Sequence, residues 1–475
     1  MAVISRYQEI ADILERQIKT AVLKTGDKLP SIRMICREHG VSITTAQTAF
    51  YELEAKSLII SRPQSGYFVS YSAKNQPQLP AKTTPDPIPG NSLVEGIFEN
   101  MLSMEAKEGF TVFSRGVPAP EHLPIPKLHK GMVQALRDLP AAATVYEHLQ
   151  GNENLRNQIA RWSFNWQGHL TKEDVITTAG CMSAISFCLK ALTKDGDTVA
   201  VESPCFYGIL NLAKSMHLNV IELASHPETG VDLVNLENVF KEHQPKACLL
   251  VSNFSNPFGG HIPTENKKEV VRLINKYQVP LIEDDLYGDL YFGKNRPACC
   301  KSFDTEGMVL WCGSFSKTLA PGYRVGWVAP GRFKEQVIKQ KLYHTLNSPP
   351  LQSEVIGKFL ENGRYETHLR KLRKTLYANY LNYLKVISEA FPEGTKASRP
   401  QGGLSLWLEL PEAINTVELY EVAFRNKITF SPGRMFTLQE QYTNCLRLSL
   451  GLVWNSLTEQ RLRKLGELAK RQLLI

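Results

Sequence analysis

The stretch SFSKTLAPGYRVGW, residues 314–327, decides the fold of most of this chain. It follows the apolar run VLWC, which ends at residue 312, and it leads into a second apolar run, RVGWVAP, which begins at residue 324. Lys317 therefore stands between two short runs that have the length and composition of buried strands. A lysine at the end of such a strand predicts a reactive group at the edge of a sheet.

Five more apolar runs precede this stretch, and helical stretches separate them. They are DVITTAG (174–180), TVAVESP (198–204), NVIELAS (219–225), ACLLVSN (247–253) and PLIEDD (280–285). Strands that alternate with helices predict an α/β fold with a mostly parallel sheet that is covered on both faces. In such sheets the functional groups gather at the carboxyl ends of the strands.

The residues at these strand ends favour one use of Lys317. A phosphate-binding P-loop would require glycine at position 316, which is serine here. The alternative is a Schiff base with pyridoxal phosphate (PLP). PLP requires an anion site, an acid for its ring nitrogen, donors for its phenolic oxygen and a flat partner for its ring, and the strand ends offer a candidate for each. An exposed lysine beside serines would be the structural alternative.

The first 70 or so residues follow a different pattern. Apolar residues recur every three or four positions from Tyr7 to Ala21, which predicts an amphipathic helix. Ser31 is expected to cap a short helix that ends at Gly40, and Ser42 to cap the next. The segment LIISRPQSGYFV (58–69) predicts a β-hairpin. Helix, helix, turn, helix and hairpin together describe a winged helix-turn-helix.

This order of elements predicts DNA binding by the third helix. Its apolar stripe consists of Ala46, Ala49, Phe50 and Leu53. The opposite face presents Thr44, Thr45, Gln47, Thr48 and Tyr51 to a major groove. Arg33, Arg37 and Arg62 are expected to contact phosphates or a minor groove, and Gly66 to form the tip of the wing. A small helical interaction module with a solvated polar face is the alternative.

A proline-rich segment separates the two patterns. Residues 72–90 contain five prolines and no apolar periodicity, which favours an extended linker over a surface loop within one domain. We therefore expect a DNA-binding domain at 1–71, a linker at 72–104 and a second domain at 105–475. Within the second domain we expect a large part at about 140–345 and a small α+β part at about 105–139 and 346–475.

The composition is that of an ordinary globular protein of 475 residues, with 43% hydrophobic and 21% charged residues. Nine cysteines without a CxxC pair disfavour a metal site and suit reduced thiols. There is no apolar stretch of about 20 residues, and the N-terminus carries charges where a signal peptide would be apolar, so we expect a cytoplasmic protein without membrane contact. The net charge of +8 permits a nucleic-acid partner.

These motifs resemble known families. Residues 105–475 are similar to the fold type I aminotransferases, and residues 1–70 resemble the GntR-type winged helix in GDKLPSIR, VSITTAQTAFYELEAKSLI and RPQSGYFV. The two joined by a proline-rich linker resemble the MocR subfamily of bacterial transcription regulators. That resemblance implies PLP as cofactor, operator DNA as partner, a small amino acid or amine as effector, and a domain-swapped homodimer.

The resemblance also implies roles for individual residues. Lys317 matches the lysine that holds PLP, Asp284 the acid at the pyridine nitrogen, and Phe206 the stacking ring. The remaining matches are Tyr287 and Asn256 for the phenolic oxygen, Ser314, Ser316, Arg324, Gly180, Cys181 and Met182 for the phosphate, Tyr146 for the phosphate of a neighbouring subunit, and Arg447, with Asn256, for a substrate or effector carboxylate.

Three departures from the family pattern involve four positions. Cys181 and Met182 stand where serine and a polar residue are common, so a side-chain donor to the phosphate is in question. Ile43 stands where many relatives carry arginine, which puts one DNA contact in question. Arg434 stands where a smaller residue is common, and it is either a second carboxylate contact or a surface charge.

Three functions follow for comparison. The first is a transcription regulator that binds operator DNA and senses PLP, an amino acid or an amine as an aldimine. The second is a working aminotransferase with an appended DNA-binding domain, since the set from Lys317 to Arg447 looks complete. The third is a sensor that keeps only the shape of the fold, which the intact lysine, acid and arginine disfavour.

Overall fold

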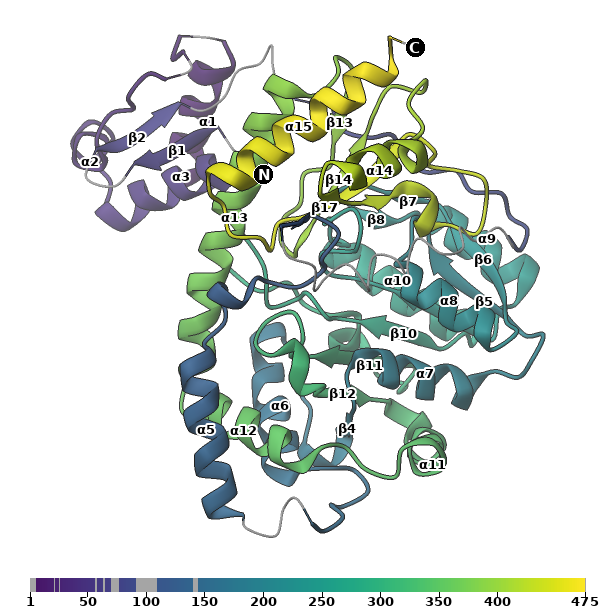
Figure 1. The fold of residues 1–475 in the computed structure, drawn as a ribbon. Coiled ribbons are helices and arrows are strands. Elements are labelled where there is room, and N and C mark those ends of the chain that lie inside the picture. The colour runs from purple at the N-terminus through teal and green to yellow at the C-terminus, as the bar shows by residue number, and fades with distance from the viewer. Residues whose placement is uncertain are drawn as a thin grey trace. The chain divides into compact units, whose positions relative to one another are not determined.

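The computed structural model describes residues 6–20, 22–24, 26–55, 58–62, 65–69, 77–90, 109–139 and 144–474. It divides the chain into two units (Figure 1). One unit contains Met1–Pro77 and Leu384–Glu389, and the other contains Gln78–Tyr383 and Ala390–Ile475. Within the described residues, no helix is both long and apolar enough to cross a membrane.

The first unit has the predicted order of elements. Its helices are α1 (Arg6–Lys19), α2 (Ile32–His39) and α3 (Ile43–Ala55), and its hairpin pairs β1 (Ile59–Arg62) with β2 (Gly66–Val69). Ser31 caps α2 by accepting a hydrogen bond from the Met34 amide, and Gly40 ends this helix in the left-handed conformation. The four apolar residues predicted for the third helix are fully buried, and they pack against Ile10, Leu14 and Ile18 of α1. Ala21, at the end of the predicted periodicity, lies outside the described residues.

The second unit is built on a seven-stranded sheet of order β4-β12-β11-β10-β9-β5-β6. These strands are β4 (Ile176–Thr178), β5 (Thr198–Glu202), β6 (Asn219–Leu223), β9 (Ala247–Leu250), β10 (Leu281–Asp284), β11 (Val309–Ser314) and β12 (Gly326–Ala329). All seven apolar runs of the sequence supply one strand each. Only β12 is antiparallel to its neighbours, so its beginning lies at the edge where the other strands end.

Helices cover both faces of this sheet. One face packs on α7 (Cys181–Leu192), α8 (Tyr207–Ser215) and α11 (Lys334–His344), and we call it the α7 face. The other face packs on α9 (Leu233–His243) and α10 (Thr264–Tyr277), and we call it the α10 face. Successive residues of a strand alternate between the faces, as Val199 and Val201 do against Ala200.

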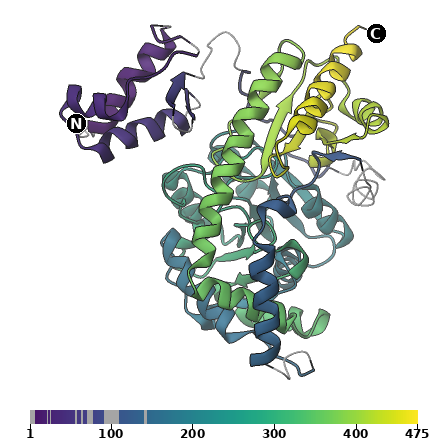
Figure 2. The same ribbon diagram turned by 60° about the vertical axis from the view of Figure 1, so that its left-hand side comes forward.

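A four-stranded antiparallel sheet follows in the sequence, with the order β13-β14-β17-β16. Its strands are β13 (Lys396–Ala397), β14 (Ser405–Glu409), β17 (Cys445–Ser449) and β16 (Ser431–Pro432). Figure 2 shows α13 (Arg364–Ala390) as one long helix. The other helices of the unit are α5 (Ile125–Asp138), α6 (Glu153–Ser163), α12 (Pro350–Glu361), α14 (Thr416–Arg425) and α15 (Ser456–Gln472). Short strands pair β3 (Thr111–Val112) with β15 (Ile428–Thr429), and β7 (Ser225–His226) with β8 (Gly230–Val231).

The predicted linker is described only in part, since residues 72–76 and 91–104 lie outside the described residues. Its described residues, 77–90, contain no helix, and Gln78 forms a parallel bridge with Lys396. The described part of the segment is hydrogen bonded to the second unit at several residues, from Gln78 to Asp86.

Candidate functional site

The carboxyl ends of the parallel strands surround a cavity of about 110 Å³. Every cofactor residue named from the sequence lines it, apart from Gly180 and Tyr146. The lining residues are Cys181, Met182, Ile185, Phe206, Val251, Asn256, Asp284, Leu286, Tyr287, Ser314, Ser316, Lys317 and Arg324. Ile185, Val251 and Leu286 were missed, because an apolar side chain in a buried strand or helix carries no signal that distinguishes a cavity wall from the core.

One side of the cavity has the character of an anion site. The helix α7 begins directly after Gly180, whose φ of 92° is in the region that favours glycine. Arg324 donates from Nη1 to the Ser316 hydroxyl at 3.5 Å and from Nη2 to the Ala179 carbonyl at 3.3 Å. A Cβ at position 180 would lie 2.5 Å from Arg324 Nη2, so a larger residue there would displace the guanidinium from its present place. Free amides of a helix N-terminus beside an arginine suit a phosphate.

Asp284 and Asp285 lie on opposite faces of the sheet. Asp284 lines the cavity on the α7 face, where the Cys181 thiol donates to its Oδ1 at 3.3 Å and the Leu286 amide donates to the same atom at 3.2 Å. Burial raises the pKa of Asp284 to about 6, against the lowering effects of the Cys181 thiol and the positive charge of Lys317. A cation placed beside this carboxyl would favour its ionised form.

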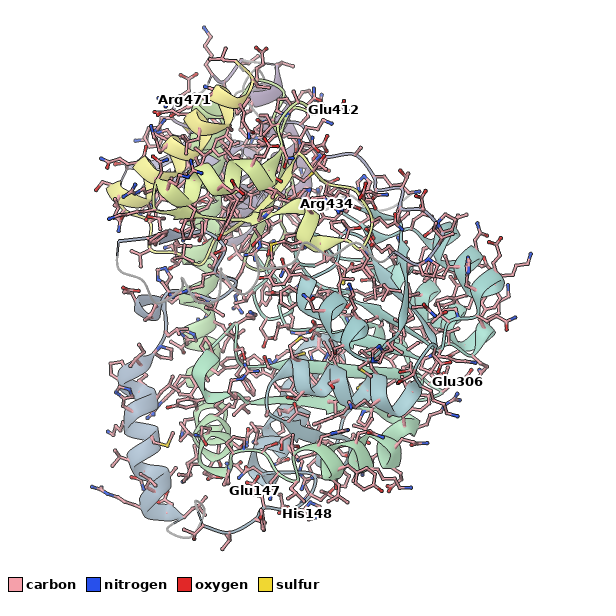
Figure 3. The ribbon with its side chains drawn as sticks, turned by 45° about the vertical axis from the view of Figure 1, so that its right-hand side comes forward. Glu147, His148, Glu306, Glu412, Arg434 and Arg471 are labelled. Carbon is pink, nitrogen blue, oxygen red and sulfur yellow. The ribbon has the colours of Figure 1, made fainter. Side chains whose placement is uncertain are left out.

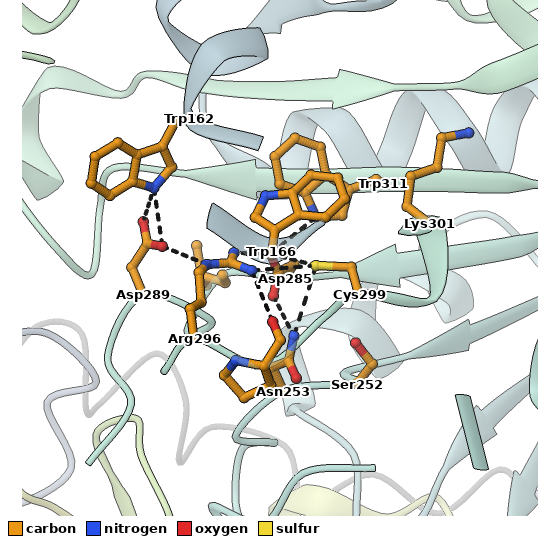
Figure 4. A network of polar contacts seen from close by, with 12 residues as sticks. Trp162, Trp166, Ser252, Asn253, Asp285, Asp289, Arg296, Cys299, Lys301 and Trp311 are labelled. Atoms are coloured by element: carbon orange, nitrogen blue, oxygen red, sulfur yellow. Dashed lines mark hydrogen bonds and ion pairs between the residues drawn. The ribbon is translucent and has the colours of Figure 1, made fainter. Parts of the chain in front are cut away.

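Asp285 belongs to a buried network on the other face (Figure 4). Its carboxylate accepts hydrogen bonds from Asn253 at 3.0 Å, Trp311 at 3.0 Å and Cys299 at 3.2 Å, and it pairs with Arg296. This carboxylate is fully engaged by groups of its own chain, so its role is structural. Asp284 and Asp285 are adjacent in the sequence, but side chains of successive residues point to opposite faces of a sheet, so the two carboxylates are separated.

Lys317 follows β11 and shares the cavity with Asp284. A Cβ built on Gly116 would lie 3.7 Å from Lys317 Nζ, so a segment distant in the sequence borders the amine. That segment was not identified from the sequence, because a glycine backbone beside a side chain has no local signature.

Tyr287 and Asn256 also line the cavity. Both are buried, and their side chains are hydrogen bonded to each other. The Ser405 hydroxyl donates to Asn256 Oδ1 at 3.1 Å. The amide nitrogen of Asn256 takes no part in this hydrogen bond and can donate to another acceptor. Burial raises the pKa of Tyr287, so its hydroxyl is a proton donor at neutral pH.

Arg447 lies outside the cavity lining but close to Tyr287, whose pKa its positive charge lowers. Its side chain is only 1% exposed on β17, and Nη2 donates to the Ser431 hydroxyl at 3.0 Å. Its Nε and Nη1 are buried without a hydrogen-bond partner. A buried guanidinium with two orphaned donors suits a carboxylate, which would accept both hydrogen bonds.

Two residues that were considered as contacts of a phosphate or a carboxylate, Tyr146 and Arg434, do not line the cavity. Tyr146 is 83% exposed and does not line the cavity, so its assignment to a neighbouring subunit stays a prediction. Arg434, labelled in Figure 3, is half-buried and donates to the Gln439 carbonyl. Burial raises the pKa of Glu222, and the charge of Arg434 opposes that shift. These contacts with its own chain favour neither the carboxylate contact nor the surface charge expected from the sequence.

The DNA-binding candidates lie on α2, α3 and the hairpin. Ser42 caps α3 by accepting a hydrogen bond from the Thr45 amide at 3.1 Å. Thr44 and Tyr51 are exposed, while Thr45, Gln47 and Thr48 are half-buried; Arg33 and Arg37 are exposed on α2. The side chain of Arg62 lies outside the described residues. Gly66 has a φ of 100°, which agrees with the tight turn predicted for the wing.

Comparison with known proteins gives two family matches. The model described as aminotransferase class I and II matches residues 117–462, and the model for bacterial regulatory proteins of the gntR family matches residues 6–69. The HTH-type transcriptional regulators YjiR and YdcR of Escherichia coli strain K12 are 35% and 34% identical to this chain. Each alignment covers 98% of this chain, with 99% of YjiR and 100% of YdcR.

Solved aminotransferases share the fold of the second unit. The multiple substrate aminotransferase of Thermococcus profundus has a TM-score of 0.75 at 26% identity, over 80% of this chain and 96% of its own. LysN, the α-aminoadipate aminotransferase of Thermus thermophilus, was solved with N-(5′-phosphopyridoxyl)-L-leucine. It has a TM-score of 0.74 at 26% identity, over 79% of this chain and 95% of its own.

The class I and II aminotransferase family depends on pyridoxal phosphate. The residues of the cavity fit that cofactor, since they offer an anion site, a buried acid, a lysine and a ring at one edge of the sheet. The family match extends over most of the second unit, and the regulators match the chain from end to end. This chain therefore belongs to the MocR subfamily of GntR-type transcription regulators, in which a winged helix-turn-helix is joined to an aminotransferase class I and II domain.

Proposed function

We propose that this protein binds operator DNA through its first unit and senses PLP, or an amino acid or amine that reacts with PLP, in its second. The observation that carries this proposal is the cavity, which gathers Lys317, Asp284 and the Arg324 guanidinium in a chain that also carries a winged helix-turn-helix. A DNA-binding domain has no use in a purely metabolic enzyme.

The residues of the cavity would hold the cofactor as follows. The amides at the start of α7, with Ser314, Ser316 and Arg324, would bind the phosphate. Asp284 would hold a proton on the ring nitrogen, and Phe206 would stack on the ring. When bound, PLP supplies an aldehyde that condenses with amines and a ring that withdraws electrons.

The remaining residues would orient an effector. Tyr287 and Asn256 would donate to the phenolic oxygen, and the orphaned Nε and Nη1 of Arg447 would bind an α-carboxylate. Lys317 would hold the cofactor aldehyde through its amine, and that amine would accept or release a proton when an effector is bound. An effector that binds two states of the protein unequally shifts the equilibrium between them, which is the physical basis of a regulator.

The cofactor is tested by absorbance. Purified protein with added PLP is expected to show the absorption of the bound cofactor, and Lys317→Ala is expected to lack it. Lys268→Ala is a suitable control, because Lys268 forms an exposed ion pair with Glu265 on α10, away from the cavity. A parent protein whose spectrum does not change with PLP would end the proposal.

The DNA-binding part is tested at the wing. Gly66→Val is expected to weaken binding to a duplex selected from a random pool, because valine is strained at a φ of 100°. Gly196→Val is the matched control, since Gly196 has a φ of 83° in the second unit with open space around it. Unchanged affinity in Gly66→Val would show that the wing takes no part.

Aminotransferase activity is a second candidate, because the orphaned donors of Arg447 suit the carboxylate of an amino acid substrate as well as that of an effector. A screen of amino donors against 2-oxoglutarate and pyruvate separates the two functions. Robust turnover by a protein that does not retain DNA would favour the enzyme.

A further inference from the structure

Residues 78–90, which we call the strap, follow directly after the first unit in the chain and belong to the second unit. The strap is bonded to the four-stranded sheet and to segments that follow strands of the seven-stranded sheet. At its start, the Ala397 amide of β13 donates to the Gln78 carbonyl at 2.8 Å. Further along, Lys82 pairs with Asp232, the residue that caps α9. A segment anchored in this way changes its own path when the structure beneath it moves.

Thr83 is the most firmly held residue of the strap. It is 7% exposed, and its amide donates to the Ser225 carbonyl at 2.9 Å. Its hydroxyl donates to the Ser203 carbonyl at 2.9 Å and accepts from the Ser225 amide at 2.7 Å. One side chain therefore joins the segments that follow β5 and β6, two strands of the seven-stranded sheet. Ser203 lies three residues before Phe206, which lines the cavity.

A second attachment lies at Asp86. Its amide donates to Gln439 Oε1 and its carbonyl accepts from Gln439 Nε2, each at 2.9 Å. Gln439 follows Phe436, whose carbonyl accepts from the Cys205 amide at 2.8 Å. The ring of Phe436 lies 5.9 Å from the Arg447 guanidinium. The strap thus contacts two loops, 203–206 and 436–439, which are bonded to each other and which carry Phe206 and the neighbour of Arg447.

We propose that the strap couples the occupancy of the cavity to the DNA-binding unit, and that Thr83 is the positioning residue of this coupling. The inference rests on the proposed function and names how that site would be regulated. A cofactor or effector that orders Phe206 or Arg447 also restricts the conformations of loops 203–206 and 436–439. These loops hold the strap, which follows directly after the DNA-binding unit in the chain. Coupling between two sites of this kind is commonly 5-fold to 150-fold in affinity.

The test uses the full chain, PLP as the probe and a duplex selected from a random pool by the parent protein. The quantity measured is the ratio of the DNA dissociation constants with and without saturating PLP, and then with a panel of amino acids added. The parent is expected to show a ratio that differs from one by about 5-fold or more. Thr83→Val, which keeps the shape and removes the hydroxyl, is expected to bring the ratio to within about 2-fold of one.

Two variants serve as controls. Thr83→Ser keeps the hydroxyl and is expected to restore the parent ratio. Thr84→Val makes the same change at the next residue, whose side chain is exposed, and is expected to behave as the parent. A merely structural Thr83 would lower the thermal midpoint of Thr83→Val and leave the ratio unchanged. That outcome, with normal PLP absorption, overturns the inference.

Hydrogen exchange on the parent gives a second test that needs no variant. PLP is expected to slow exchange of the bonded Thr83 and Asp86 amides by about 5-fold or more. Unchanged exchange at both amides in protein that does bind PLP would also overturn the inference. A parent that binds no PLP would instead contradict the proposed function, so the two failures are distinguishable.

Discussion

The two faces of the sheet at the end of β10 use the same residue type in opposite ways. On the α10 face, Asp285 is surrounded by donors from Asn253, Trp311, Cys299 and Arg296 (Figure 4). On the α7 face, Asp284 has a thiol and one backbone amide as donors, and it borders a cavity. A fully satisfied buried carboxylate holds structure together, whereas one with spare acceptor capacity beside a cavity is available to a ligand.

The two acids therefore differ in role: Asp285 contributes to folding stability, and Asp284 is available to bind a ligand. The Asp285 network also includes Asp289, which pairs with Arg296 and accepts from Trp162 and Tyr365. It lies directly behind the strand that carries Asp284, so it holds the end of β10 and the cavity wall in place. Rigid support behind a binding residue is what preorganises a site.

The largest effect on the free energy of unfolding is expected from a substitution that disrupts the Asp285 network on the α10 face. Arg296→Met leaves Asp285 and Asp289 buried without their cation, and is expected to lower the free energy of unfolding by about 3–5 kcal/mol. Arg272→Met, which removes an exposed ion pair with Glu269, is expected to lower it by less than about 1 kcal/mol. Urea unfolding of the two variants measures both values. Equal losses would contradict the distinction between the faces.

The next effect concerns the α7 face. Asp284→Asn is expected to leave folding stability almost unchanged and to weaken PLP binding by about 1.5–3 kcal/mol, since it removes a charged hydrogen bond to the ring nitrogen. PLP affinity of the parent is expected to rise with pH through about 6, as Asp284 ionises, and that of the variant to lack this rise. Titrations followed by absorbance test both. Destabilisation of Asp284→Asn as large as that of Asp285→Asn would show that the two acids share one role.

A further effect, on the pH dependence of stability, is expected from Glu202, a buried acid at the end of β5 near Asp284. Burial raises its pKa to about 8, and the Val251 amide donates to it at 3.1 Å. Because the folded state keeps a proton that the unfolded state releases above about 4.5, stability should fall between pH 5 and 8 by about 1 kcal/mol per pH unit. Glu202→Gln is expected to flatten this slope in urea unfolding. If stability depends on pH in Glu202→Gln as it does in the parent, a group other than Glu202 holds the proton.

The smallest effect is expected on PLP affinity, and it comes from substitution of Cys181. Cys181→Ala removes a weak thiol donor from Asp284 and is expected to reduce PLP affinity by a few-fold, at a cost below about 1 kcal/mol. Cys181→Ser keeps a donor at this position and is expected to bind at least as well as the parent. Cys188→Ala, a buried cysteine of the same helix that does not line the cavity, serves as the control. An affinity for Cys181→Ala equal to that of the parent would show that the thiol has no part in binding.

Much of the site was predicted from the sequence because strand ends are marked locally. Each parallel strand ends at or within two residues of a polar residue, and a parallel sheet brings such ends to one edge whatever the helices between them contain. Lys317, Asp284 and Asn256 could be placed together for this reason. The apolar wall formed by Ile185, Val251 and Leu286, and the approach of Gly116 to Lys317, could not, because they depend on contacts between segments far apart in the chain.

What the sequence determined by itself was the set of elements and the chemistry at their ends, since periodicity, capping residues and turn residues act over a few positions. The tertiary structure alone decided that the thiol of Cys181 faces Asp284, that two donors of Arg447 are left without partners, and that the proline-rich segment is bonded to the second unit through Thr83. Each of these depends on distances between elements that are remote in the chain, and packing sets those distances.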